Sequence, residues 1–587
     1  MDGRHCLIQY RTRLTARPDT SAPGRVLKYK WLPRPETHSK DEDLPDIAGI
    51  SGPVGSLARR RGLDAAFFLS EYSTLSPWRN LPGADSASLI LEDAVRSGNL
   101  ILVHGDFDAD GITATATAVR VIRALGGQAQ YYIPSRFQDG YGLGKAAIDL
   151  CIQQGVKVLI TVDCGITSID EVARLKENGV KVIITDHHKP LNTLPEADVV
   201  VDPELSRDSS VRWRYLSGAG VVHTVLRGLA ERMDSAAIPE LEPDLVSIGT
   251  VCDVVKLTGD NRVLVRRGLD ILRTKPSPGV LALMRAVGID YTGVTTRDIS
   301  FGLGPVINSS GRIAHADQAV KLLLETEPGL AVGMASGLEK TNAKRKSLDS
   351  AVFAEADSLL ANTRTGIAVA ASEHWHAGVI GISASKLARQ MNRPVVLVAW
   401  DGDTGRGSAR GVPGKPVYPI LEKAMENGLL LSFGGHDQAA GISLKTDRYA
   451  EFKSFVERTA DTLYAEDSGP VLYIDGGLSA EQCNTSVLDA LRDFEPFGEG
   501  NPEPVWIIRG VYPVSFRSVG QNGKHLQISF QSGNTTLRGI GFGMGHRTSE
   551  LDRILDVAFT LSADSWRGGD AVQLVVLDIK PAAGRRK

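Results

Sequence analysis

Apolar runs of strand length alternate with stretches of helical periodicity between residues 98 and 290. The apolar runs, each of which predicts a buried strand, are 99–104, 156–162, 180–185 and 198–201. The stretches between them predict helices, most clearly over 111–125 and 168–178. Strands separated by helices are typical of a mostly parallel sheet covered on both faces. The sequence therefore predicts an α/β domain in this part of the chain.

The pattern changes after this domain. A largely helical stretch runs from 219 to about 360, and its last part, 338–361, predicts a connecting helix. A second α/β pattern follows, with strands near 367–371 and 394–399 and helices near 379–390 and 416–427. The C-terminal region gives short alternating runs that suit an OB-type β-barrel, at 505–511, 525–530, 536–540, 557–561 and 572–579.

The N-terminus lacks this periodicity. Pro18, Pro23, Pro33 and Pro35 precede an acidic patch at 41–43, a composition typical of a poorly ordered segment. The chain is therefore expected to have five parts: an extension over 1–55, an α/β domain with a helical extension over 56–337, the connecting helix over 338–361, a second α/β domain over 362–465, and a barrel over 466–587.

Composition narrows the class of protein. Of the 587 residues, 42% are hydrophobic and 23% are charged, as in ordinary soluble proteins. No apolar run approaches the roughly 20 residues of a membrane span, and the five cysteines show no zinc-binding spacing. We therefore expect a reduced, cytoplasmic protein that is not bound to a membrane. The net charge of −3 argues against a protein that only coats DNA, because such proteins are usually basic.

Acidic side chains and histidines follow three of the predicted strands. In chain order they are Asp106, Asp108 and Asp110 after the first strand, Asp163 after the second, and Asp186, His187 and His188 after the third. Because the carboxyl ends of parallel strands share one edge of a sheet, these groups are expected to converge. A single Asp after a strand is commonly a turn or helix cap. Several carboxylates in one crevice, however, repel each other unless cations lie between them.

A mixture of carboxylate oxygens and imidazole nitrogens suits Mn²⁺ or Mg²⁺. Two ions roughly 3.5–4 Å apart would suit phosphodiester hydrolysis, because one activates water and both stabilise charge on the phosphate. Asp253, at the end of a helix-like segment, is a further candidate ligand. The sequence therefore predicts a metal-dependent phosphoesterase.

Longer motifs extend this pattern along the chain. In order they are H-G-D-F-D-A-D-G at 104–111, G-Y-G-L at 140–143, V-D-C-G-I at 162–166, T-D-H-H at 185–188, V-D-P at 201–203, S-G-A-G-V at 217–221, G-T-V-C-D-V-V at 249–255, L-G-P-V-I-N-S-S-G-R-I at 303–313, W-H-A-G-V-I-G-I at 375–382, G-S-A-R at 407–410 and F-G-G-H at 433–436. The set resembles the DHH phosphoesterase superfamily, and within it the exonucleases that degrade single-stranded DNA. The chain departs from that pattern at Ser309 and Ser310, where alanines are usual, and at Cys252, where a small residue is usual.

The resemblance implies a fold with a parallel-sheet DHH domain, a long connecting helix, a DHH-associated α/β domain and an OB-type barrel. It also implies 5′→3′ hydrolysis of single-stranded DNA to 5′-mononucleotides in DNA repair and recombination. The implied cofactor is Mn²⁺ or Mg²⁺, with two ions bound. The resemblance further implies a monomer whose candidate partners are a RecQ-type helicase and a single-stranded-DNA-binding protein.

Residue by residue, the resemblance implies three sets. The metal ligands are His104, Asp106, Asp108, Asp110, Asp163, His187 and Asp253. The catalytic residues are Asp108, Asp110, Asp163, His187, His188, Asp253 and Arg312. The substrate contacts are Asn308, Arg312, His376, Ser408, Arg410 and His436. In the barrel, the candidate contacts to a DNA backbone are Arg517, Lys524, His525 and Arg538, while Phe516 is a candidate stacking residue and Phe530 is expected in the core.

Two alternatives stay open at this point. A DHH phosphodiesterase for short oligoribonucleotides or cyclic dinucleotides would use the same metal site, although small substrates need no strand-binding barrel. An inactive nucleic-acid-binding scaffold on the same fold would be expected to have lost metal ligands, and the candidate ligands are all present in this sequence.

Overall fold

A computed structural model describes residues 29–35, 52–136, 139–140, 142–235, 241–464, 469–564 and 571–582. The chain forms two compact units. Of the described residues, those within 69–344 and 495–502 form the first unit, and those within 29–68, 345–494 and 503–582 form the second. A short segment from the C-terminal third of the chain therefore belongs to the first unit.

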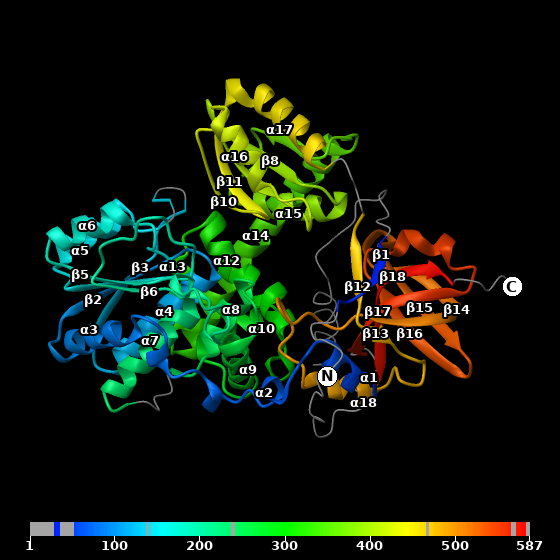
Figure 1. Cartoon of the computed structure of the whole chain (residues 1–587), viewed down its shortest axis with the longest axis horizontal. Helices are drawn as coiled ribbons and strands as arrows, with labels where there is room; N and C mark the ends of the chain where they lie inside the picture. Colours follow the sequence, from blue (N-terminus) through cyan, green and yellow to red (C-terminus); the bar gives the residue numbers. More distant parts are fainter. Residues whose placement is uncertain are drawn as a thin grey trace, which may run out of the picture. The chain divides into compact units, whose positions relative to one another are not determined.

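A five-stranded parallel sheet forms the α/β domain of the first unit (Figure 1). Its strands are β2 (Leu100–Gly105), β3 (Gln128–Tyr132), β4 (Val158–Val162), β5 (Lys181–Thr185) and β6 (Val199–Val201), in the spatial order β3-β2-β4-β5-β6. The four predicted strands are confirmed. The sequence does not predict β3, because this edge strand is partly exposed and its Q-A-Q-Y-Y sequence carries no apolar run.

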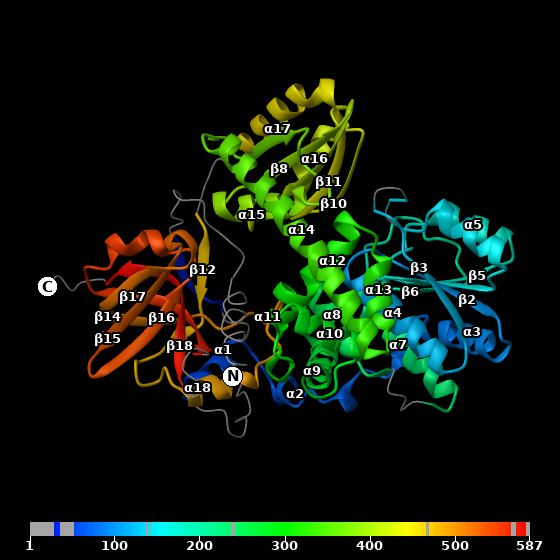
Figure 2. The same ribbon diagram turned by 180° about the vertical axis from the view of Figure 1, so that it is seen from behind.

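Both faces of this sheet are covered by helices. Leu102 and Leu159 pack under α5 (Lys145–Gln154) and α6 (Ile169–Glu177). Val103 and Ile160 point to the opposite face, which is covered by α3 (Ala84–Arg96), α4 (Ala109–Ala124) and α7 (Gly218–Arg232). Figure 2 shows the sheet and the helices on its two faces from behind. Burial on both faces explains why these strands have continuous apolar sequences.

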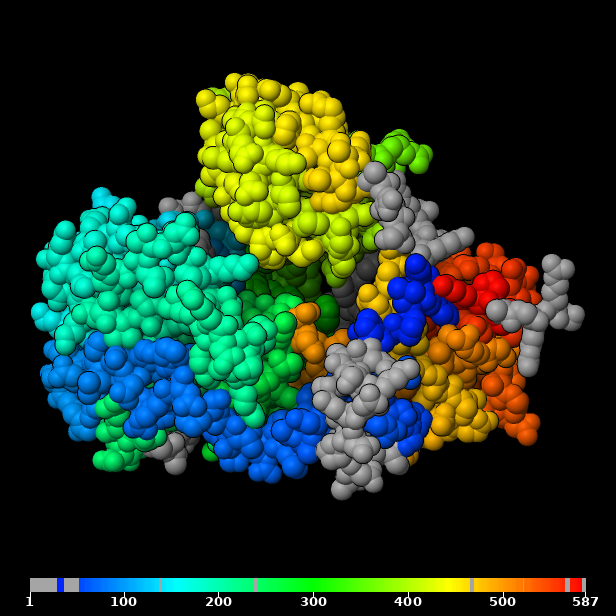
Figure 3. Space-filling model, viewed as in Figure 1, coloured from blue at the N-terminus to red at the C-terminus, as the bar shows by residue number. Residues whose placement is uncertain are grey.

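A helical region with its own apolar core follows the sheet. Its helices are α8 (Asp244–Cys252), α9 (Gly259–Thr274), α10 (Pro278–Ala286), α11 (Thr296–Asp298), α12 (Gly304–Ile313) and α13 (Asp317–Leu324), with a π-helical turn, η6 (Ile299–Leu303), between α11 and α12. The segment Glu495–Pro502 packs on this region, because Leu257 donates its N–H to the Glu499 carbonyl at 2.8 Å. Figure 3 shows this segment in orange against the green helices.

The connecting helix is α14, which spans Pro328–Leu360 and so begins earlier than the expected position 338. Proline is favourable in a first helical turn, where no N–H partner is available. The Glu327 carboxylate accepts the N–H groups of Gly329 and Leu330 at 3.0 and 2.6 Å, which caps this start. In the described part of the chain, no helix combines the length and apolar composition that crossing a bilayer requires.

The second unit contains another α/β domain. Its strands are β7 (Ala368–Ser372), β8 (Val395–Asp401), β9 (Thr404–Arg410), β10 (Ser432–His436) and β11 (Ala439–Lys445), in the order β10-β11-β9-β8-β7. Its helices are α15 (Ile380–Met391), α16 (Tyr418–Glu426) and α17 (Tyr449–Leu463). The predicted β7, β8, α15 and α16 are confirmed. The antiparallel strands β9 to β11 were not predicted, because glycines interrupt their apolar alternation.

A closed β-barrel forms the C-terminal part of the second unit. Its strands are β14 (Trp506–Val519), β15 (His525–Ser532), β16 (Thr535–Gly541), β17 (Leu555–Ala563) and β18 (Val572–Pro581). They pair in the order β14-β15-β16-β18-β17, and β17 pairs back with β14 to close the barrel. All five predicted runs are therefore strands. Phe530 is fully buried, as expected of a core residue, whereas Phe516 is 46% exposed.

The N-terminal extension is ordered where the structure describes it, which the local sequence did not predict. The strand β1 (Lys30–Pro33) pairs in parallel with β12 (Val471–Ile474), a partner that lies too far along the chain for local periodicity to reveal. The helices α1 (Gly52–Arg60) and α2 (Ala65–Phe68) also belong to the second unit, and among the described residues the first unit begins at Leu69. Residues 1–28 and 36–51 lie outside the described residues.

Candidate metal centre

The acidic loop between β2 and α4 is both a helix cap and a source of carboxylates. Asp108 is the N-cap of α4, and its Oδ1 accepts the N–H groups of Asp110 and Gly111 at 3.0 and 3.1 Å. Gly111 permits the tight return of the loop, because a Cβ there would lie 2.6 Å from the backbone of Asp106. The capping interpretation of D-x-D is therefore correct for Asp108, and it also fixes where the acids point.

The N-terminus of α7 holds the third acid of the loop. Asp110 is buried, and its carboxylate accepts the N–H groups of Gly218 and Ala219 at 2.6 and 3.1 Å. Residue 218 must be glycine, because a Cβ there would lie 2.4 Å from the Cβ of Asp163. The S-G-A-G motif therefore brings Asp110 and Asp163 together, a role that the sequence pattern alone does not reveal.

The acids and histidines at the strand ends converge as predicted. Among the described residues, three groups have ligand atoms within 4.8 Å of one another: Asp106, Asp108 and Asp163; Asp110, His187 and Asp253; and Asp163, His187 and His188. The Nε2 atom of His187 lies 3.0 Å from Asp163 Oδ1 and 3.6 Å from Asp253 Oδ2. Asp163 directly follows β4 with a φ of 64°, and Asp253 caps the end of α8.

The donor atoms of this cluster fit a divalent cation. No described residue makes a hydrogen bond to His187 Nε2, Asp163 Oδ1, Asp253 Oδ2 or Asp106 Oδ1, although all four atoms are buried. The 3.0 Å contact between His187 and Asp163 is close enough for an ion pair but lacks the alignment of a hydrogen bond. A buried polar atom without a partner is unfavourable. Oxygen and nitrogen atoms that face one another in this way are suitable ligands for Mn²⁺ or Mg²⁺.

Burial and the crowding of carboxylates shift the pKa values of the cluster, and the same two features favour a bound cation. Burial, followed by the charge of Asp108, raises the pKa of Asp106 to about 8 and that of Asp110 to about 7. Burial and the neighbouring carboxylates also raise the pKa of Asp163 and of Asp253 well above the usual value. Burial lowers the pKa of His187 to about 4, so its imidazole is neutral and can offer a lone pair.

Asp186 orients the second histidine of the D-H-H motif. Its buried carboxylate lies 2.8 Å from His188 Nδ1 and accepts the N–H groups of His187, His188 and Ile166. Burial alone would raise the pKa of Asp186, but the hydrogen bond and charge of His188 outweigh it and hold that pKa below its usual value. Burial alone would lower the pKa of His188, but the hydrogen bond and charge of Asp186 raise it to about 9.

Some predicted residues lie apart from the three ligand groups. His104 is buried at the end of β2, its Nδ1 lies 3.5 Å from Cys164 Sγ, and burial lowers its pKa to about 4. It belongs to none of the groups found among the described residues. Asn308 and Arg312 lie one helical turn apart on α12, and Asn308 Oδ1 accepts the N–H of Ala109 at 2.9 Å.

Arg136 is a candidate functional residue that the sequence analysis missed. Its guanidinium lies 4.0 Å from the centre of the Phe107 ring, and its Nε donates to the Gly311 carbonyl at 3.2 Å. Burial lowers the pKa of Arg136, and the charges of Asp106 and Asp108 oppose that shift. The residue places a positive charge beside the acidic loop. The available signal was its position just after β3, the strand that the sequence did not predict.

The remaining candidates lie on the sheet of the second unit. Ser408 and Arg410 are two residues apart on β9 and so point to one face, on which α15 packs. Gly381 at the start of α15 leaves room for them, because a Cβ there would lie 2.9 Å from an Arg410 nitrogen and 3.0 Å from the Ser408 hydroxyl. Arg410 pairs with Ala439, which pairs with His436, so one end of the sheet carries both side chains. His376 precedes α15, where its Nδ1 accepts the Gly378 N–H at 3.0 Å.

Three family models match the chain in the order of its domains. The model described as "DHH family, N-terminal domain" matches residues 100–250, "DHHA1 domain" matches residues 364–462, and "RecJ OB domain" matches residues 474–578.

Full-length relatives extend this match. "Single-stranded-DNA-specific exonuclease RecJ" of Salmonella typhimurium is 35% identical over 575 residues, which cover 93% of this chain and 98% of that protein. The protein of the same name from Thermus thermophilus is 35% identical over 91% of this chain and 76% of its own length. A crystal structure of Thermus thermophilus RecJ in complex with Mn²⁺ has a TM-score of 0.78 and 31% identity, over 95% of this chain and 80% of that one. The Mg²⁺ complex gives a TM-score of 0.73. From its acidic loop to its C-terminal barrel, this chain belongs to the RecJ family of DHH proteins.

Proposed function

We propose that this protein is a metal-dependent exonuclease that hydrolyses single-stranded DNA 5′→3′ and releases 5′-mononucleotides. The observation that carries the proposal is the convergence of carboxylates and imidazoles at the carboxyl edge of the parallel sheet, where buried donor atoms face one another. Membership of the RecJ family supports the substrate class, because the relatives are named for single-stranded DNA.

We assign the direct ligands of two ions to five residues: Asp108, Asp110, Asp163, His187 and Asp253. Two divalent ions held there would activate water and stabilise charge on the phosphate. Asp106 lies beside Asp108 and Asp163 and belongs to the same group of ligand atoms. His188, which Asp186 orients, would donate a hydrogen bond to the phosphate. His104 is a further candidate ligand, because its buried Nε2 has no hydrogen-bond partner among the described residues.

Positive charge near the acids would hold the scissile phosphate. Arg136 lies beside the acidic loop, and Arg312 is on α12, whose backbone Arg136 contacts. A planar guanidinium can donate two parallel hydrogen bonds to a phosphate and so stabilise the charge that develops in the transition state. These two arginines would offset the repulsion between the carboxylates and an incoming nucleotide.

Donors in the second unit would bind the rest of the strand. Ser408 and Arg410 lie near the N-terminus of α15, an arrangement that suits a phosphate. His376 and His436 would add contacts from the same domain. In the barrel, Phe516 is 46% exposed on β14 and offers a stacking surface for a base. Arg517, the next residue on the strand, is a candidate for a contact to the DNA backbone. Lys524, His525 and Arg538 are further candidates for backbone contacts.

Digestion of one DNA strand labelled at either end tests the proposal. In Mn²⁺, a 5′ label is expected to appear at once as a mononucleotide, whereas a 3′ label is expected to pass through a ladder of shortening products. Neither label should be released in EDTA. Release from the 3′ end first would overturn the polarity. A strong preference for dinucleotides over long strands would instead favour the DHH phosphodiesterase alternative.

We further propose a role in DNA repair and recombination in the cytoplasm, together with a RecQ-type helicase and a single-stranded-DNA-binding protein. The support is the family match alone. Stimulation of duplex digestion when a RecQ-type helicase and ATP are added tests this role. An unchanged rate would count against the helicase partnership.

A further inference from the structure

We infer that Asn308 is a positioning residue that sets the geometry of the metal centre through the backbone of the acidic loop. The inference deepens the proposed function and rests on the metal centre proposed there. The family resemblance implied a substrate contact for Asn308. In the structure its side-chain oxygen is already engaged, because Asn308 Oδ1 accepts the N–H of Ala109 at 2.9 Å.

Ala109 is the first residue of α4, and it lies between two carboxylates of the centre. The Asp108 carboxylate satisfies the N–H groups of Asp110 and Gly111, and the N–H of Ile112 bonds to the Asp108 carbonyl. The N–H of Ala109 remains, and Asn308 satisfies it from another helix. A side chain of α12 thus completes the cap of α4 and fixes the peptide that joins Asp108 to Ala109.

Glycines let the same helix approach the loop closely. A Cβ at Gly311 would lie 2.2 Å from the Phe107 carbonyl oxygen, so α12 and the loop touch through their backbones. Arg136 contacts both partners, because its Nε donates to the Gly311 carbonyl and its guanidinium lies over the Phe107 ring. Asn308 and Gly311 are one turn apart on α12 and therefore share one face of the helix.

The opposite end of α12 contacts the element that carries Asp253. A Cβ at Gly304 would lie 2.5 Å from Cys252 Sγ, and Cys252 is the last residue of α8, directly before Asp253. Gly304 and Asn308 are also one turn apart, so one face of α12 touches both the acidic loop and the end of α8. The π-helical turn η6 leads directly into α12. The helix thereby spaces Asp108 and Asp110 from Asp253.

Asn308→Leu removes the acceptor and keeps a similar volume, whereas Asn308→Asp keeps an oxygen in the same place. We expect Asn308→Leu to weaken Mn²⁺ binding, measured by calorimetry on the full chain without DNA, by roughly 10–100-fold, as for other residues that orient metal ligands. Its kcat should fall while its KM for single-stranded DNA stays unchanged. Asn308→Asp should bind Mn²⁺ as well as wild type. If Asn308→Leu does not fold, Asn308→Ala removes the same acceptor without its bulk.

Ser310→Ala is the matched control on the same helix, because among the described residues its hydroxyl donates to the Ile307 carbonyl, within α12 itself. It should behave as wild type. Wild-type affinity for Mn²⁺ in Asn308→Leu, with a raised KM for DNA, would show a substrate contact and overturn the inference. Equal loss of Mn²⁺ affinity in Asn308→Leu and Asn308→Asp would overturn it as well. Failure of the proposed function is separable, because wild-type protein would then bind Mn²⁺ without hydrolysing DNA.

Discussion

Buried carboxylates lie side by side in the metal centre, and this arrangement opposes folding when no cation is bound. Burial and the charge of Asp108 raise the pKa of Asp106 to about 8. In the metal-free protein Asp106 therefore keeps its proton at neutral pH, whereas the unfolded chain releases it near about pH 4. Folding takes up a proton in this range, so the free energy of unfolding falls as pH rises from about 4 to about 8.

Asp106→Asn has no proton to release, so its metal-free form is expected to be more stable than wild type by a margin that grows with pH. The margin should increase by at most about 1.4 kcal/mol for each pH unit in this range. Melting temperatures of both proteins in EDTA, at about pH 5 and about pH 8, measure it. A margin that does not change with pH would mean that Asp106 is ionised throughout and that the centre is less desolvated than its burial indicates.

Asp163 and His187 each belong to two of the three ligand groups, and Asp163 is the carboxylate that the first and third of these groups share, so its loss should matter greatly for hydrolysis. We expect Asp163→Ala to abolish Mn²⁺-dependent hydrolysis while the protein stays soluble and folded. Removing one of several crowded carboxylates relieves repulsion, which offsets the roughly 1–2 kcal/mol that alanine loses at a left-handed φ. Nuclease assays and circular dichroism check the two parts, with Glu177→Ala at the exposed end of α6 as control. Full activity in Asp163→Ala would remove this residue from the metal centre.

At the scale of elements, the N-terminus of α7 positions two of the proposed ligands, Asp110 and Asp163. Its first N–H groups hold Asp110, and Gly218 makes room for Asp163. Gly218→Ala should therefore push Asp163 away and lower kcat by roughly 100-fold, the cost of a displacement of about 1 Å.

The matched control for Gly218→Ala is Gly337→Ala, which makes the same change inside α14 at a position where a new Cβ meets nothing within 4 Å. That variant should keep wild-type activity and gain up to about 1 kcal/mol of stability, since alanine favours a helix interior. Comparable kcat values for the two variants would show that the contact between Gly218 and Asp163 is unimportant.

Local sequence predicted the strands that are buried on both faces. The strands β2, β4 and β5 are apolar on both faces, and the acids after them could be placed at one edge by topology alone. Edge and glycine-rich strands such as β3 and β9 carry too little apolar signal to be recognised. The candidate residue Arg136 was missed for the same reason, because it follows β3 and cannot be placed when that strand is not recognised.

Contacts between distant parts of the chain were also beyond prediction. The N–H of Ala109 finds its acceptor on residue 308, and the N-terminal strand β1 finds its partner at residues 471–474. Neither pairing produces a hydrophobic pattern that could be recognised in the sequence. Family resemblance assigned residues to roles, but it did not distinguish a side chain that would touch substrate from one that holds the backbone of the site.

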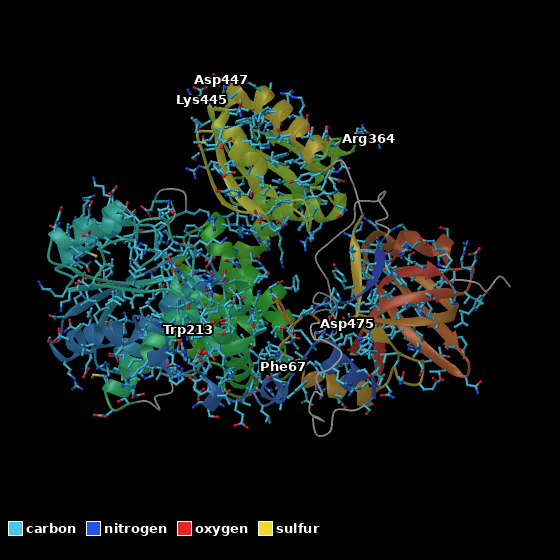
Figure 4. All side chains as sticks on the ribbon, in the orientation of Figure 1. Phe67, Trp213, Arg364, Lys445, Asp447 and Asp475 are labelled. Atoms are coloured by element: carbon cyan, nitrogen blue, oxygen red, sulfur yellow. The ribbon has the colours of Figure 1, made fainter. Side chains whose placement is uncertain are left out.

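At the scale of the whole molecule, the second unit is joined through a buried carboxylate that gathers segments from both ends of the chain. Asp475, labelled in Figure 4, is fully buried and accepts hydrogen bonds from Arg34 Nε at 2.7 Å, Arg61 Nε at 3.0 Å and the N–H of Val505 at 3.0 Å. Nearby, Trp31 of β1 donates to Asp578 of β18 at 2.7 Å. Residues before the first unit thus complete the C-terminal region.

Removing one partner of a buried ion pair leaves a charge without compensation, which typically costs about 3–5 kcal/mol. Arg61 is 7% exposed and Arg34 is 24% exposed, so Arg61 is the more desolvated partner of Asp475. We therefore expect Arg61→Met to lower the free energy of unfolding of the full chain more than Arg34→Met does, as measured by chemical denaturation. In an Asp475→Asn background both effects should shrink, because the buried charge is gone.

Mn²⁺ affinity should not change in any of these variants, since Asp475 and the metal centre belong to different units. Equal destabilisation by the two single substitutions would mean that burial does not govern this network of ion pairs and that Arg34 contributes as much as Arg61 does.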